Sequence, residues 1–161
     1  MKDREMIARL RDLRQRRENR AKETVIHRHA AAYRATLQVQ DAASAVAAHI
    51  QRTADAEETA FGSLVGQPVK ATNLSRLQGR FEMAAREAEQ LRENEKQAGV
   101  VEGERKAELS AARRDHRASV KALTKLDRLS EQMTRRTARR RVALAELSEE
   151  DERGPSRSPT Q

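Results

Sequence analysis

The first 61 residues contain neither glycine nor proline, and such a run is rare outside long helices. Helix breakers then gather in one short segment, at Gly62, Gly66 and Pro68. Because glycine supplies positive φ and proline removes a backbone donor, this segment predicts a turn. No further proline follows until Pro155. The chain is therefore expected to form two long helices with one break between them.

These breakers also set the expected bounds. Thr72 or Asn73 can cap the second helix, and Gly154 with Pro155 can stop it. The expected elements are a first helix over about 2–62, a turn over 63–72, a second helix over about 73–152 and a disordered tail over 154–161.

Apolar side chains repeat every seven residues along the second segment. One row steps by seven from Leu77 to Leu147, and eight of its eleven members are apolar. The companion row runs from Phe81 to Leu144, with a polar stretch between about 95 and 105. Two such rows indicate a heptad seam and a left-handed supercoil.

The first segment has a less regular apolar stripe, and a stutter near 38–43 would keep it on one face. Its members are Met6, Leu10, Leu13, Ile26, Ala30, Tyr33, Leu37, Ala43, Val46 and Ile50. Two amphipathic helices joined by a short loop pack most simply against each other. The predicted fold is all-α, with two long helices in an antiparallel coiled-coil hairpin over 1–153.

In such a hairpin, residue i lies opposite a residue near 135 − i, and the second helix overhangs the first by about four turns. A first helix of about 60 residues is roughly 90 Å long, so an elongated monomer is expected. The register also brings Gly99 and Gly103 near Tyr33. These glycines either make room for the tyrosine ring or form a flexible point.

Composition supports helices rather than a compact single-core domain, because 36% of residues are charged and 2% are aromatic. The net charge of +8 is unevenly distributed. Residues 1–28 carry ten basic and five acidic side chains, and residues 110–141 carry eleven and three. Both basic blocks are expected at the same end of the hairpin.

Catalytic chemistry is almost unrepresented. Cysteine is absent, which excludes disulfides and thiolate catalysis and is typical of a reducing compartment. Neither a phosphate-binding loop nor a His-Glu-x-x-His motif occurs. We expect no catalytic site, no metal site and no cofactor. Without a signal-peptide pattern or an apolar run long enough to span a bilayer, a soluble intracellular protein is expected.

Two groups of residues are candidates for partner binding. The basic candidates have three open interpretations, namely a solvated face, a site for an acidic protein surface or a site for nucleic-acid phosphates; they are Arg14, Arg16, Arg17, Arg135, Arg136, Arg139, Arg140 and Arg141. The apolar candidates either close the hairpin or form an exposed patch at the turn; they are Leu64, Val65 and Val69.

This pattern resembles the YscO/FliJ-type central stalk proteins of type III secretion and flagellar export. The resemblance rests on a small, basic, cysteine-free chain, an arginine-rich opening helix over 9–17, Tyr33 in mid-helix, a loop near residue 65 and a longer second helix. It covers residues 1–152.

The resemblance implies a cytoplasmic stalk at the periphery of an inner-membrane secretion apparatus. Its termini end would bind the hexameric export ATPase, and its turn would contact the cytosolic ring of the export gate. Some members of the family also bind substrate chaperones. The membrane would be reached only through the gate protein. The alternatives are a basic coiled-coil adaptor that binds nucleic acid and a helical structural spacer.

Overall fold

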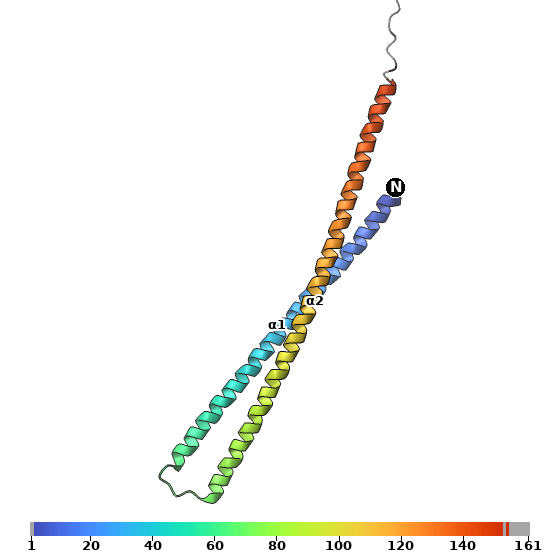
Figure 1. Cartoon of the computed structure of the whole chain (residues 1–161). Coiled ribbons are helices and arrows are strands. Elements are labelled where there is room, and N and C mark those ends of the chain that lie inside the picture. The colour runs from blue at the N-terminus through green and yellow to red at the C-terminus, as the bar shows by residue number, and fades with distance from the viewer. Residues whose placement is uncertain (1, 153, 155–161) are drawn as a thin grey trace, which may run out of the picture. The chain divides into compact units, whose positions relative to one another are not determined.

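The computed structural model describes residues 2–152 and 154, and it contains two long helices. Helix α1 spans Lys2–Leu64 and helix α2 spans Ala71–Glu152, and one loop joins them (Figure 1). The predicted all-α fold, a hairpin of two long antiparallel helices, is confirmed. Apart from Gly154, the expected tail lies outside the described residues.

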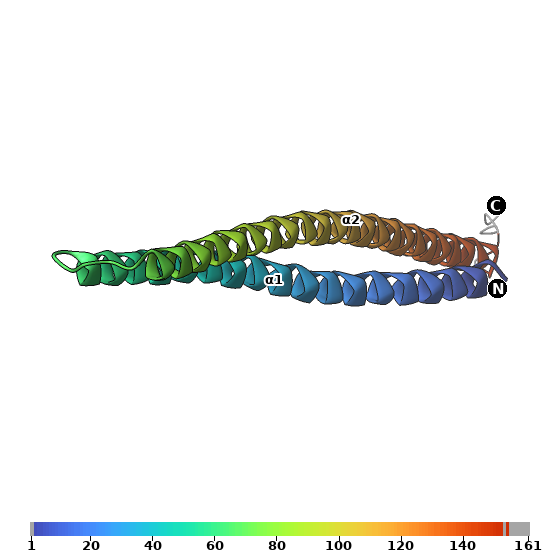
Figure 2. The same cartoon turned by 90° about the horizontal axis from the view of Figure 1, so that it is seen from below.

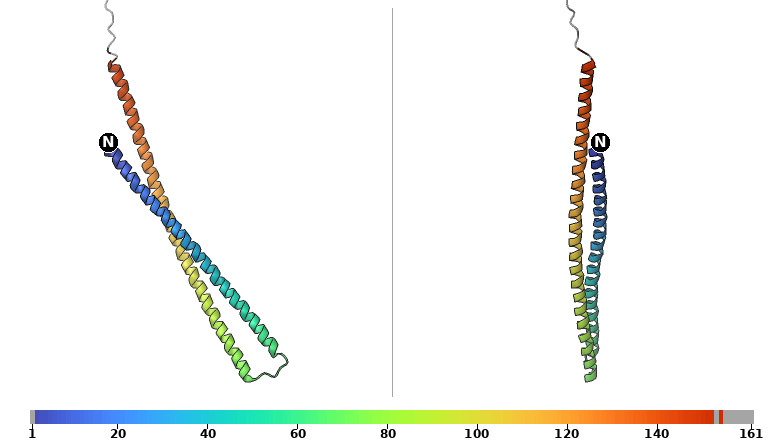
Figure 3. Two further views of the ribbon diagram at one scale, coloured as in Figure 1. Left: turned by 180° about the vertical axis from the view of Figure 1, so that it is seen from behind. Right: turned by 90° about the vertical axis from the view of Figure 1, so that its right-hand side faces the viewer.

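The chain divides into two compact units, and each unit contains part of both helices. The turn unit is Glu23–Arg113, and the terminal unit combines Met1–Lys22 with Arg114–Gln161. In the turn unit, the green parts of α1 and α2 lie side by side next to the loop (Figure 2). In the terminal unit, the red end of α2 continues past the N-terminus of α1 (Figure 3).

The loop over 65–70 contains a left-handed glycine as its second residue. Gly66 has a φ of 78°, and the backbone N–H of Gln67 donates to the carbonyl of Leu64 at 3.3 Å. The first turn of α2 closes on Lys70, whose carbonyl accepts a hydrogen bond from the N–H of Asn73 at 2.9 Å. The predicted cap at Thr72 or Asn73 is therefore wrong, because α2 begins at Ala71. Alanine propagates a helix readily, so α2 begins before either polar residue.

Both predicted heptad rows of α2 are covered over most of their length. Every member from Leu77 to Thr137 is buried or half-buried. From Ala138 to Glu152 every residue of α2 is exposed. We call this uncovered segment, 138–152, the overhang. Its fifteen residues make about four helical turns.

The predicted stripe on α1 is wrong. Seven of its ten members are exposed, namely Met6, Leu10, Leu13, Ile26, Tyr33, Leu37 and Ile50. The covered row shares only Val46 with the stripe and steps by seven without a stutter, through Val25, Ala32, Val39, Val46, Thr53 and Ala60. An unbroken heptad row stays against the unbroken rows of α2, whereas a stuttered stripe rotates away from them. The face of α1 that packs against α2 is therefore determined by an unbroken heptad period and not by the size of the side chains.

The most buried residues lie in the turn unit and are mostly small. Ala32, Ala35, Leu109 and Ala112 are 3–8% exposed, and Leu109 is the only large side chain among these four. Small side chains on α1 let it approach the larger side chains of α2 closely. The resulting core is thin, so each large buried side chain contributes a substantial share of the stability.

Contacts between the helices follow the predicted register. The register of i with 135 − i places Arg28 opposite residue 107, and its guanidinium pairs with the Glu108 carboxylate at 2.6 Å. Thr36 was expected opposite residue 99, and its hydroxyl donates to the carboxylate of Glu102 at 2.8 Å.

The two glycines in the middle of α2 fill no packing role. A Cβ atom built on Gly99 or Gly103 would have no neighbour within 4 Å, and Tyr33 is 60% exposed. The idea that the glycines make room for the Tyr33 ring is therefore wrong. Because glycine costs a helix interior about 1 kcal/mol relative to alanine, Gly99→Ala and Gly103→Ala should each raise the free energy of unfolding by about that amount. Urea denaturation followed by circular dichroism measures the change, and a loss of stability in either variant would contradict it.

Candidate interaction sites

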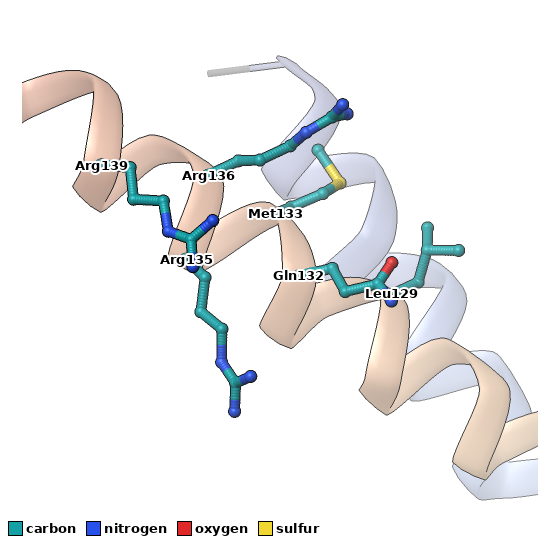
Figure 4. Close-up of a pocket in the computed structure, with 6 residues that line it drawn as sticks. All are labelled: Leu129, Gln132, Met133, Arg135, Arg136 and Arg139. Atoms are coloured by element: carbon teal, nitrogen blue, oxygen red, sulfur yellow. The ribbon is translucent and has the colours of Figure 1, made fainter.

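Five of the predicted arginines form a cluster where α2 leaves the cover of α1. We call Arg135, Arg136, Arg139, Arg140 and Arg141 the arginine cluster; all five are exposed. Three of them line a shallow surface groove together with Leu129, Gln132 and Met133 (Figure 4). In this groove Arg136 and Met133 extend towards α1, whereas Arg135 and Arg139 point away from it. The cluster thus presents cations beside a small apolar surface.

Nearby carboxylates do not neutralise the cluster. Asp127 pairs with Arg11 at 2.6 Å, and Glu18 contacts His116 at 2.8 Å. Asp12 lies 3.5 Å from Arg16. Among residues 2–152 and 154, no member of the arginine cluster forms an ion pair. Its five charges are therefore free to interact with a partner.

The predicted arginines on α1 have different environments. Arg14 is half-buried in a covered row with Ile7 and Ala21. Arg16 and Arg17 are exposed, and Arg16 has Asp12 as its partner. Of these three, Arg17 adds most directly to the exposed positive charge of the terminal unit.

Two contacts hold the helices of the terminal unit together. The hydrogen bond from Arg11 to Asp127, together with the charge of that carboxylate, raises the pKa of the Arg11 guanidinium. His116 Nε2 lies 2.8 Å from Glu18 Oε1, in a part-buried position of the seam. His116 and Glu18 occupy places that apolar residues would fill in a regular coiled coil.

The apolar residues at the turn differ in exposure. Val65 is 79% exposed, whereas Leu64 and Val69 are half-buried. Phe61 stacks on Phe81, with ring centroids 6.1 Å apart and planes inclined by 16°. This stack joins the helices beside the loop. Val65 is the most exposed of the three predicted turn residues.

Sequence reasoning did not single out His49. Its side chain is 7% exposed, its Nε2 lies 2.8 Å from the carbonyl oxygen of Ala84, and its Nδ1 lies 3.8 Å from Glu87. The carbonyl accepts a hydrogen bond from Nε2–H, which fixes the ring between the helices. The sequence does contain a signal for the burial of His49, because this residue follows Ala35 and Ala42 at seven-residue spacing in a covered row.

A second polar contact crosses the seam at the predicted polar stretch. Glu102 accepts hydrogen bonds from Lys106 at 2.7 Å and from Thr36 at 2.8 Å. The hydrogen bond from Lys106, followed by that from Thr36, lowers the pKa of the Glu102 carboxyl. Glu102 therefore remains ionised at neutral pH in a seam position.

The two units differ strongly in charge. Residues of the terminal unit include 21 basic and 12 acidic side chains, a formal charge of +9. Residues of the turn unit include 12 basic and 13 acidic side chains, a formal charge of −1. The terminal unit is thus suited to a negatively charged partner, and the turn unit is not.

No helix in the described part of the chain is long and apolar enough to cross a membrane. Within the same residues, no group of three or more His, Asp or Glu side chains could hold a metal ion. The chain matches no protein-family model, no curated protein and no solved structure at a significant level.

Proposed function

We propose that this chain is a coiled-coil stalk of the YscO/FliJ type, which links a hexameric secretion ATPase to a membrane export gate. In this proposal the terminal unit binds the ATPase and promotes its activity, and the turn contacts the cytosolic ring of the gate. Escort of substrate chaperones would be a further role. The observation that carries the proposal is the arginine cluster, five exposed arginines without an ion-pair partner among the described residues.

A structural helix gains nothing from the cluster. Arg135 and Arg139 are four residues apart, as are Arg136 and Arg140, and each such like-charge pair costs a few tenths of a kcal/mol. An acidic docking surface offsets this cost and also gains electrostatic steering. Three members of the cluster, Arg139, Arg140 and Arg141, lie on the uncovered single helix, which is about 10–12 Å across and narrow enough to enter the central opening of a ring.

Nucleic acid is a weaker fit to the same charges. Proteins that bind single strands combine cations with aromatic side chains on which bases stack. All three aromatic residues, Tyr33, Phe61 and Phe81, belong to the turn unit, so none accompanies the arginine cluster. The two ends of α2 therefore differ in both charge and aromatic content.

One mixing experiment separates the three functions. The purified chain is titrated at physiological salt into a type III secretion ATPase and, separately, into duplex DNA. We expect binding and stimulated ATP hydrolysis with the first and no complex with the second. Binding to DNA alone would replace the stalk by the nucleic-acid adaptor, and binding to neither would leave the helical spacer.

The turn provides a separate prediction. Val65→Ser should weaken binding to the isolated cytosolic ring of the export gate by about tenfold, because it removes the most exposed apolar side chain at the loop. Helicity and ATPase stimulation should stay unchanged. Val100→Ser, at a residue 58% exposed in the middle of α2, is the matched control and should leave gate binding intact. Equal effects of the two variants would remove the turn from the gate-binding surface.

A further inference from the structure

The overhang continues the covered rows of α2, but nothing in the described chain covers it. Arg140, Leu144, Leu147 and Asp151 occupy the row positions that follow Thr137. Leu144 is 66% exposed and Leu147 is 58% exposed. Each core layer of a coiled coil needs one apolar residue from each of two helices, and the overhang supplies one side of two such layers. This face is therefore suited to packing against another helix.

Charge along the overhang is arranged in two blocks. The basic block ends with Arg139, Arg140 and Arg141, and the acidic block consists of Glu146, Glu149, Glu150, Asp151 and Glu152. Leu144 lies between the blocks, and Leu147 follows Glu146, the first residue of the acidic block. A helix with this order is complementary to itself when reversed, because each block then meets the opposite charge.

We propose that the overhang pairs with the overhang of a second copy of this chain, antiparallel and about a two-fold axis. Leu144 of each copy packs beside Leu147 of the other, which gives two identical apolar layers. Counting outward from these layers, Arg140 comes opposite Asp151 of the second copy. Its neighbours Arg139 and Arg141 come close to Glu152 and Glu150. The proposal does not depend on the secretion function.

The length of the overhang fits this pairing. In the proposed register Glu152 of the second copy comes opposite Arg139, so helix α2 of the second copy ends just short of Thr137, the last covered row member of α2. A parallel pairing would instead bring basic block against basic block and acidic against acidic.

The contact is small, so the dimer is expected to be weak. Fifteen residues of helix span about 22 Å, and one such pair buries less surface than the interface of a stable dimer. Exposed ion pairs are weakened by salt, so self-association should rise with protein concentration and fall as salt is added.

Two charge-reversed variants test the pairing directly. The first is R139E/R140E/R141E and the second is E150K/D151K/E152K. Each variant alone faces like charge in the proposed register and should sediment as a monomer at concentrations where the unmodified chain dimerises in low salt. An equimolar mixture should recover the dimer, because an acidic overhang then meets a basic one. Far-UV circular dichroism establishes that both variants remain helical.

The matched control is R76E/R80E/R86E, which reverses three exposed arginines of the turn unit. This variant should dimerise like the unmodified chain. An unmodified chain that stays monomeric throughout the concentration series would overturn the proposal. A mixture of the two overhang variants that stays monomeric would do the same.

Cross-linking tests the orientation. The chain has no cysteine, so Leu144→Cys and Leu147→Cys each introduce a unique thiol. A mixture of these two variants should form a 144–147 disulfide faster than either variant cross-links to itself, because only that pair lies directly across the proposed layer. Faster self-cross-linking of Leu144→Cys would overturn the antiparallel register.

Discussion

Glutamine in place of all five residues of the arginine cluster is expected to abolish stimulation of the secretion ATPase. Each exposed charge pair with an acidic docking surface contributes about 0.5–1 kcal/mol, so losing five lowers affinity by about a hundredfold or more. The terminal unit would still carry a net positive charge, because it starts from +9. Steady-state ATP hydrolysis, measured against the concentration of added chain, gives the result.

The same variant should be slightly more stable than the unmodified chain. Removing the repulsion between residues four apart in the cluster gains a few tenths of a kcal/mol per pair. Added salt should weaken ATPase binding of the unmodified chain more than that of the variant. Salt screens the attraction between charges, and the variant has lost the five charges that contribute to it. Stability and binding are thus expected to change in opposite directions.

The control removes the same number of charges elsewhere, by changing exposed arginines of the turn unit to glutamine; they are Arg52, Arg76, Arg80, Arg86 and Arg92. It should stimulate the ATPase normally. Normal stimulation by the cluster variant, or a loss confined to DNA affinity, would assign the arginines to another partner and favour the nucleic-acid adaptor.

Truncation of Leu109 is expected to have the largest effect on stability. This side chain is 8% exposed and is surrounded by a seam made mostly of small residues, so Leu109→Ala leaves a cavity that the core cannot easily fill. The expected cost is about 2–4 kcal/mol of unfolding free energy, or a Tm lower by about 5–12 °C. Thermal and urea denaturation followed at 222 nm measure both quantities.

Met83→Ala serves as the comparison for Leu109→Ala. Met83 belongs to the same unit and the same helix but is 63% exposed, so its truncation should change the free energy of unfolding by less than about 0.5 kcal/mol. Equal losses in the two variants would mean that the helices are not held together by this seam.

The second helix could be predicted from sequence and the facing surface of the first could not. The rows of α2 contain leucines and Phe81 at a strict seven-residue spacing, so their period is visible by inspection. The covered row of α1 consists largely of alanine and valine, whereas Leu10, Tyr33 and Ile50 lie outside it. Side-chain size drew attention to the wrong face, because the regular row on α1 has little apolar surface to mark it.

The candidate sites divide in a similar way. Arg139, Arg140 and Arg141 could be identified as exposed because the overhang depends on helix lengths, and the exposure of Arg135 and Arg136 follows from the visible heptad rows of α2. Sequence alone could not predict the environment of Arg14 or the contact of His49 with Ala84, because both depend on which face of α1 meets α2. An error of one residue in a heptad frame changes a free cation into a half-buried one.

The polar stretch of the seam has a mechanical consequence. Glu95, Glu102 and Arg105 occupy covered positions there, and Gly99 and Gly103 lie between them without packing partners. Two glycines within five residues lower the helix propensity of this section, so its amides should exchange with solvent sooner than those near Leu109. When the turn unit is twisted, the section around Gly99 and Gly103 should take up most of the twist, because it resists deformation least. It should regain its original shape when the load is released.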